Sequence, residues 1–120
     1  MEHTVDFNEK QITLLLGNDV SLLEQILDIL KTDIPSHLLH LGQAIEQHDH
    51  KQIYEIAHTL KGSLANVGAE KGSSCAAHVL REAESKHTDT CRILYKSLQE
   101  TTGEFLKEFT AYVEQKRGGS

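Results

Sequence analysis

Apolar residues recur at spacings of three and four along most of this chain, which is the period of an amphipathic α-helix. The longest such run follows a helix-start signal at Asn18 or Asp19 and extends to Ile45. Pro35, the only proline, falls inside the run. Because the apolar stripe stays in phase on both sides of Pro35, we expect one long kinked helix. A second helix capped by Asp33 is the alternative.

A short helix is expected before this run. Asp6-Phe7-Asn8-Glu9 has the spacing of a capping box, in which Asp6 caps the helix, and Gly17 can end it after about ten residues. We expect residues 1–5 to be disordered, since they carry no helical pattern.

Further helical segments follow the long run. Asp49 and Gln52 repeat the capping-box spacing and open a helix over about 50–67, which Gly68 can end in a left-handed conformation. A segment over about 70–86 carries a stripe of small apolar side chains, suited to close helix approach, and its start lacks a strong cap.

A long last helix opens at Thr88 or Asp89. Its apolar positions share one face: Leu94, Leu98, Phe105, Phe109 and Val113. No segment has the period of two that is typical of strands. The pattern therefore predicts an all-α protein, an antiparallel up-down four-helix bundle with a short additional N-terminal helix. We expect residues 1–117 to form this single domain and residues 118–120, Gly-Gly-Ser, to be a flexible tail of the kind that cloning leaves behind.

Composition narrows the range of partners. Twelve Lys and Arg against 18 Asp and Glu give a net charge of −6, and the chain has no Trp, so we do not expect it to bind nucleic acid. Cys75 and Cys91 form no CxxC pair, which argues against a zinc ribbon or a disulfide framework. No apolar run approaches the ~20 residues of a membrane span. We expect a cytoplasmic monomer that does not insert into a membrane.

The segment Ala57–Gly68, AHTLKGSLANVG, contains a glycine where helix stability disfavours it. Glycine in a helix interior costs about 1 kcal/mol relative to alanine. His58 lies about 140° around the helix from the centre of the apolar stripe, so its imidazole should face water or the edge of a groove. Lys61 and Gly62 are surface neighbours of His58, because they follow it by three and four residues.

This combination suits an imidazole that exchanges a phosphoryl group. The ring must be reachable by a bulky partner, which a side chain at Gly62 would obstruct. At ~6 Å and an effective dielectric constant between about 20 and 80, Lys61 would contribute roughly 1 to 3 kcal/mol against one phosphoryl charge. Each residue alone is more simply explained as part of a solvated helix face. Their combination favours a functional role.

The run from His58 to Ser63, HTLKGS, followed by Asn66 and Gly68, resembles the signature of histidine-containing phosphotransfer (HPt) domains of two-component phosphorelays. The resemblance implies that His58 is the phosphoacceptor and that Lys61 is the cation near the phosphoryl group. It also implies residues for partner access and docking, which are Gly62, Tyr54, Ala65 and Ser63. Asn66 and Gly68 belong to the structural motif.

Two positions depart from the HPt pattern. Gly72 stands where these domains usually carry a large aliphatic residue, which predicts a locally thinner core. Leu80 stands where they often carry a polar residue, which leaves open the group that hydrogen-bonds the inner nitrogen of His58.

The resemblance implies a phosphocarrier that accepts a phosphoryl group on His58 from a receiver-domain aspartate and passes it reversibly to another receiver domain. Its implied partners are response-regulator receiver domains and a hybrid histidine kinase. The glycines of the motif form no phosphate-cradling loop, so we expect no ATP site and no enzymatic activity of its own. We expect no cofactor on this chain, and Mg²⁺ on the partner receiver domain.

Two other classes of function stay open. One is a helical docking module that binds a receiver domain or a histidine kinase without being phosphorylated, although the intact His58 argues against it. The other is a metal-binding bundle. The histidines and carboxylate that suggest a metal are His37, His40, Glu46, His48 and His50. They show no paired Glu-x-x-His pattern on facing helices, as a bundle metal site requires.

Overall fold

The computed structural model describes residues 7–118 and contains five helices. They are α1 (Glu9–Leu16), α2 (Val20–Glu46), α3 (His50–Asn66), α4 (Glu70–Glu84) and α5 (Thr88–Gly118). Residues 7–118 include no strand, so the predicted all-α class is confirmed. The predictions for residues 1–5 and for 119–120 lie outside the described residues. α5 continues through Gly118, one residue beyond the predicted domain end.

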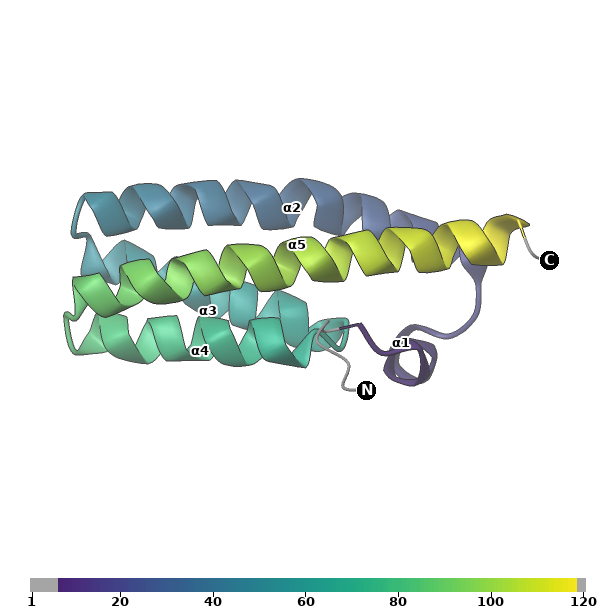
Figure 1. Ribbon diagram of the computed structural model, residues 1–120, viewed down its shortest axis with the longest axis horizontal. Coiled ribbons are helices and arrows are strands. Elements are labelled where there is room, and N and C mark those ends of the chain that lie inside the picture. Colours follow the sequence, from purple (N-terminus) through teal and green to yellow (C-terminus); the bar gives the residue numbers. More distant parts are fainter. Residues whose placement is uncertain (1–6, 119–120) are drawn as a thin grey trace.

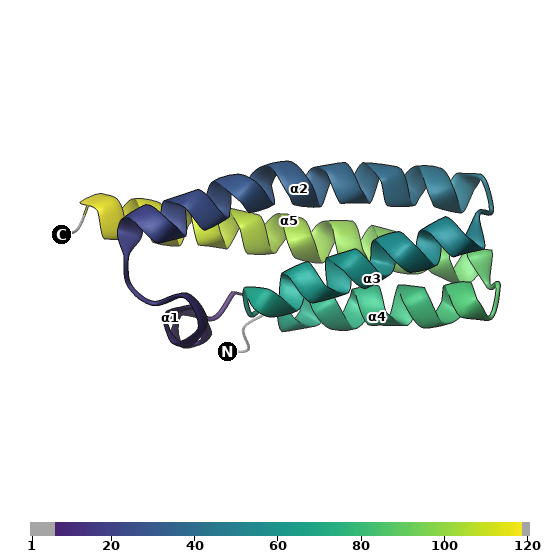
Figure 2. The ribbon, with the colours of Figure 1, turned by 180° about the vertical axis from the view of Figure 1, so that it is seen from behind.

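The four long helices form an up-down bundle in which each helix reverses the direction of the one before it (Figure 1). α2 and α5 are the longest and run past the end at which α3 and α4 stop. α1 lies at that end, and the view from behind shows the same arrangement (Figure 2). The predicted four-helix bundle with a short N-terminal helix is therefore confirmed.

Side chains cap three of the helices at their N-termini. Asp19 and Asp49 accept backbone hydrogen bonds from the residues three positions later, each at 3.2 Å, as the capping spacing predicts. Asn8 caps α1 in the same way and accepts from the backbone N–H of Gln11 at 3.2 Å. The N-cap of α1 is therefore Asn8, so the prediction of Asp6 as the cap was wrong. Asp6 itself lies outside the described residues. α1 consequently begins at Glu9 and has eight residues.

α2 is continuous through Pro35, so the alternative of a new helix starting after Asp33 is wrong. α3 ends in a Schellman motif. Gly68 has a φ of +75°, its N–H donates to the carbonyl of Ala65 at 3.1 Å, and the N–H of Ala69 donates to Leu64 at 2.9 Å. The predicted left-handed glycine is confirmed.

An aromatic cluster attaches the N-terminal segment to α5. The ring of Phe7 lies 5.8 Å from Phe105, 5.8 Å from Phe109 and 5.3 Å from Tyr112, centroid to centroid. These separations are within the range of favourable aromatic pairs. Ile12 of α1 is also buried. Phe7, just before α1, therefore covers aromatic side chains of α5.

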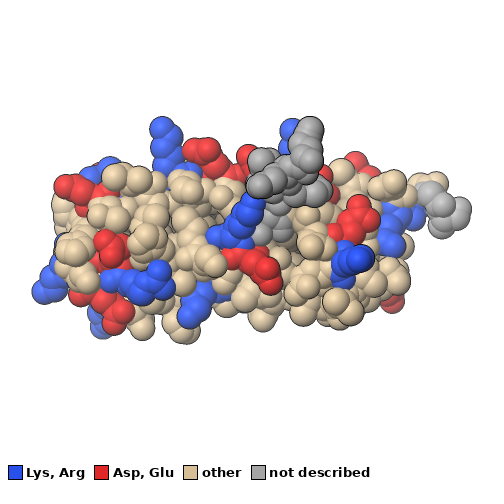
Figure 3. Space-filling model, turned by 60° about the horizontal axis from the view of Figure 1, so that its bottom comes forward, with Lys and Arg blue, Asp and Glu red and all other residues tan. Residues whose placement is uncertain are grey.

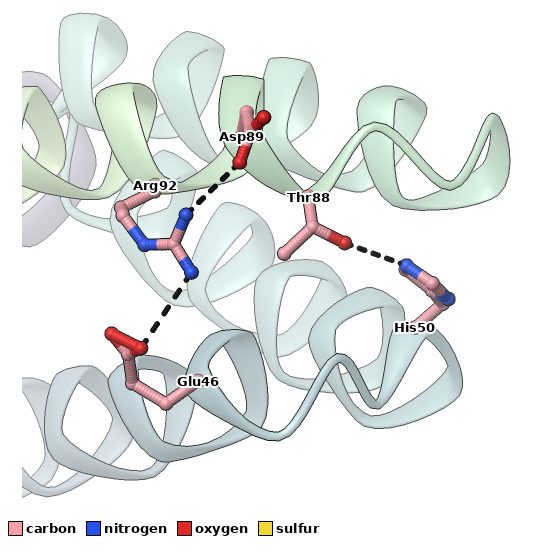
Figure 4. Close-up of polar contacts among 5 residues, drawn as sticks. All are labelled: Glu46, His50, Thr88, Asp89 and Arg92. Carbon is pink, nitrogen blue, oxygen red and sulfur yellow. Dashed lines mark hydrogen bonds and ion pairs between the residues drawn. The ribbon is translucent and has the colours of Figure 1, made fainter.

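Hydrogen bonds and ion pairs join the turns at the other end of the bundle (Figure 4). The ring Nε2 of His50, at the start of α3, lies 2.8 Å from the hydroxyl of Thr88, at the start of α5. Arg92 of α5 reaches both Asp89, at 3.1 Å, and Glu46 of α2, at 3.6 Å. α5 is thus tied to both helices that meet at the α2–α3 turn.

Gly42 allows α2 and α5 to approach closely. The hydroxyl of Tyr95 on α5 donates to the carbonyl of Leu38 at 2.8 Å, and a Cβ on Gly42 would lie 2.6 Å from that hydroxyl oxygen. Burial raises the pKa of Tyr95, so the phenol stays protonated and able to donate at neutral pH.

Gly42→Ala is expected to lower the free energy of unfolding by about 1 kcal/mol. Displacing the Tyr95 ring costs about 1 to 3 kcal/mol, which exceeds the gain of about 1 kcal/mol in helix propensity. Denaturant unfolding measures the change. The same substitution at Gly103 is the control, because a Cβ there meets nothing within 4 Å, and it should raise stability. If Gly42→Ala is as stabilising as Gly103→Ala, the close approach does not constrain this position.

Candidate functional site

His58 lies near the middle of α3, on the side that faces away from the core. The residues that face the core are fully or almost fully buried: Ile53, Ala57, Leu60 and Leu64. The side chain of His58 is exposed, as the helical period predicts. The backbone of α3 therefore holds this imidazole on a rigid, well-packed element with its ring open to solvent.

Four of the predicted site residues share this face of α3. Relative to His58, Tyr54 lies about 40°, Lys61 about 60° and Ala65 about 20° to one side, whereas Gly62 lies about 40° to the other. All four are exposed. The structure thus brings the imidazole, the cation and the glycine onto one continuous stretch of surface.

The other predicted positions lie elsewhere. Ser63 is half-buried and about 140° around α3 from His58, so it does not belong to the same face. Asn66 is exposed at the last position of α3. Gly68 is buried in the α3–α4 turn, where a Cβ would lie 2.8 Å from the Cγ of Gln11 on α1. Gly68 thus ends α3 and leaves room for α1.

Packing within the chain does not require glycine at position 62. A Cβ built on Gly62 would meet nothing within 4 Å. At Gly42, by contrast, the ring of Tyr95 occupies the space that a side chain would need. The space above Gly62 is open surface beside His58, which a docked molecule could occupy. α4 supports this turn, since the hydroxyl of Ser73 donates to the carbonyl of Lys61 at 2.9 Å.

The ring of His58 is restrained by an aromatic neighbour. Its centroid lies 6.3 Å from that of Tyr54, and the two rings are inclined by only 17°. Within residues 7–118, no hydrogen bond reaches either ring nitrogen of His58. Leu80 of α4, 9% exposed, has an apolar side chain and supplies no polar group. Sequence reasoning placed Tyr54 near the site but missed this stacking, although the spacing of four residues was the available signal.

Charges of both signs are scattered around the bundle. Figure 3 shows Lys and Arg side chains interspersed with Asp and Glu on one face, without a continuous patch of either sign. Near His58, Lys61 is one exposed cation, and Glu55, three residues before His58, is an exposed anion on the same helix. The charge around His58 is therefore mixed, with an exposed cation and an exposed anion on the same helix.

The two thiols are poor candidates for nucleophiles. Burial raises the pKa of Cys75 and of Cys91, which disfavours the reactive thiolate. Both are free cysteines, and their sulfurs lie near backbone carbonyl oxygens, at 3.5 Å from Leu94 and 3.7 Å from Val79 respectively.

The histidines that suggested a metal site are not gathered together. Among residues 7–118, no group of three or more His, Cys, Asp and Glu side chains is arranged to hold a metal ion. The ring Nδ1 of His37 lies 2.7 Å from the carbonyl of Asp33, and Nε2 of His50 contacts Thr88. None of the helices within residues 7–118 combines the length and the apolar character that a membrane span requires.

Comparison with known proteins identifies one family. The family model described as Hpt domain matches residues 25–117, from within α2 to near the end of α5. No curated protein and no solved structure matches the chain. The match includes the whole of α3 and its exposed histidine, whereas α1 lies outside it.

Proposed function

Because the chain belongs to the Hpt domain family, we propose that it carries a phosphoryl group on His58, taken from the aspartyl phosphate of one receiver domain and given to another. Membership of the family places the protein in two-component phosphotransfer. The observation that supports this assignment best is the exposed imidazole on α3, with a cation and an unobstructed glycine on the same face.

In the proposed reaction, the neutral imidazole attacks phosphorus in line with the leaving carboxylate. The lone pair of a ring nitrogen forms the N–P bond, and the O–P bond of the aspartyl phosphate breaks. The receiver aspartate leaves with that electron pair as a carboxylate. This chain contributes a positioned nucleophile and the charge of Lys61, while the receiver domain contributes its own Mg²⁺ and most of the charge stabilisation.

The phosphoryl group must come from a partner, since Hpt domains are phosphotransfer modules without an ATP site of their own. We propose receiver domains as direct partners and a hybrid histidine kinase as the upstream source. We propose that transfer is reversible, since the carboxylate of an unphosphorylated receiver domain can attack the phosphorus of the phosphohistidine by the same step in reverse.

A panel of phosphorylated receiver domains tests this function. Label transferred to the protein should be lost in acid and kept in alkali, as a phosphoramidate bond requires and an acyl phosphate does not. Return of the label to unphosphorylated receiver would establish reversibility. A protein that binds receivers but takes no label from any donor would instead be a docking module.

Lys61→Ala is expected to slow transfer from a receiver by about five- to hundred-fold without changing the fold. Lys61 is exposed, and its charge contributes roughly 1 to 3 kcal/mol at ~6 Å from a phosphoryl group. Single-turnover transfer at rising salt is the measurement, because screening should shrink the difference from wild type. Lys107→Ala, a change of the same kind at an exposed position of α5, is the control. An effect of Lys61→Ala that is independent of salt or confined to thermal stability would make Lys61 structural.

A further inference from the structure

Tyr54 is an exposed aromatic residue that does not serve the core. It is 37% exposed on the outer face of α3, and its hydroxyl has no hydrogen-bond partner within residues 7–118. Within residues 7–118, the aromatic ring that it contacts is that of His58, at 6.3 Å between centroids and 17° between planes. Nearly parallel rings at this separation form an offset stack, within the 4.5–7 Å range of favourable pairs. The contact therefore restrains the imidazole rather than the fold.

The direction of this restraint follows from helix geometry. Side chains on an α-helix lean toward its N-terminus, so His58 lies over the turn that carries Tyr54. The two residues are four apart, and their rings meet on the surface of one rigid helix. Tyr54 can thus limit the tilt of the imidazole plane without any contribution from α4, where Leu80 offers no hydrogen bond.

The tilt of the ring matters to phosphoryl transfer because the nitrogen lone pair lies in the plane of the imidazole. Phosphorus must approach along that lone pair while the aspartate oxygen leaves on its opposite side. In this step the N–P bond forms as the P–O bond breaks, and the departing carboxylate takes the electron pair. A ring held in one plane fixes the line of approach before the partner arrives.

We propose that Tyr54 is a positioning residue, which stacks on His58 and holds the imidazole plane in line with the phosphorus of a docked receiver. This inference rests on the proposed function of His58. It differs from a docking role for Tyr54, in which the phenol ring would only add contact area to the receiver interface.

Single-turnover transfer from a phosphorylated receiver domain, chosen because it labels wild-type protein, separates the two roles. Tyr54→Leu keeps an apolar side chain but removes the stack. We expect the rate at saturating receiver to fall about two- to ten-fold, which is the range for loss of one aromatic pair. The receiver concentration at half-saturation should stay unchanged, and Tyr54→Phe should restore the wild-type rate.

Two further measurements test whether Tyr54→Leu leaves the reactivity of His58 intact and whether it removes the ring contact. Labelling by phosphoramidate, a small donor that needs no docked orientation, should be the same in wild type and Tyr54→Leu. In NMR spectra, the ring protons of His58 should show a ring-current shift that Tyr54→Leu abolishes and Tyr54→Phe keeps. Lys107→Ala, at an exposed position of α5, should change none of these values.

Several results would overturn the proposal. If Tyr54→Leu shifts only the half-saturating receiver concentration, Tyr54 is a docking residue. If Tyr54→Phe is as slow as Tyr54→Leu, the hydroxyl matters instead of the stack, and if Tyr54→Leu matches wild type in rate, the contact is incidental. If wild-type protein takes label neither from a receiver domain nor from phosphoramidate, the proposed function of His58 is itself refuted. The failure of phosphoramidate distinguishes this outcome from the three that concern Tyr54 alone.

Discussion

His58→Gln is expected to reduce phosphoryl acceptance to background while leaving the fold intact. The imidazole is the proposed nucleophile, and a glutamine amide has no lone pair able to replace it. The side chain is exposed and makes no hydrogen bond within residues 7–118, so its replacement removes little packing. Surface substitutions of this kind usually change stability by no more than about 0.5 kcal/mol. Labelling by a receiver domain and by phosphoramidate measures phosphoryl acceptance, and thermal unfolding measures the stability of the fold.

The other histidines provide matched controls. His40→Gln and His78→Gln make the same chemical change at exposed positions on α2 and α4. Both variants should accept label as wild type does, and the label should remain labile in acid. Undiminished labelling of His58→Gln, or loss of labelling in either control, would show that another histidine is the acceptor.

Gly62→Gln is expected to slow transfer from a receiver by about ten- to hundred-fold while sparing labelling by phosphoramidate. A glutamine side chain fits the bundle, because a Cβ at Gly62 meets nothing within 4 Å. It would extend over the surface beside His58 and collide with a docked receiver. Overpacking of about 1 to 3 kcal/mol at an interface corresponds to this range of rates. Comparing the two donors on one variant separates access from chemistry.

A matched pair of variants isolates the steric effect. Gly103→Gln makes the same change at an exposed, open position of α5, and it should leave both donors unaffected. Gly62→Ala should raise the free energy of unfolding by about 1 kcal/mol, since alanine has the higher helix propensity. If both donors slow together in Gly62→Gln, glycine matters to the imidazole itself. If neither slows, access to His58 does not depend on Gly62.

Much of the fold follows from local patterns. The period of three and four marks the buried stripes of the four long helices, because a helix must place its apolar side chains on one face to leave water. Asp19, Asp49 and Gly68 end or begin helices as predicted, since capping involves only groups close in sequence. The short-range signal was ambiguous at α1, where Asn8 takes the role expected of Asp6.

Part of the candidate site could likewise be predicted from local spacing, and part could not. His58, Lys61 and Gly62 follow from spacing alone, because residues three and four apart on a helix are neighbours whatever else the chain does. The same period, applied to Ser63, places that residue on another side of α3. Spacing does not show whether the chain's own packing requires glycine at position 62. The structure shows that it does not, because a Cβ at that position would meet nothing within 4 Å.

The helices, their buried faces and the exposed histidine could be predicted from the sequence, since each depends on backbone period and on residues within one or two turns. Which distant groups meet depends on how the helices pack against one another. Examples are Tyr95 over Gly42, Phe7 against α5 and His50 against Thr88. These contacts depend on the rotation of each helix about its axis and on side-chain rotamers, which are set when all helices pack together. The stacking of Tyr54 on His58 lies between the two cases, because spacing permits the contact and the rotamers select it.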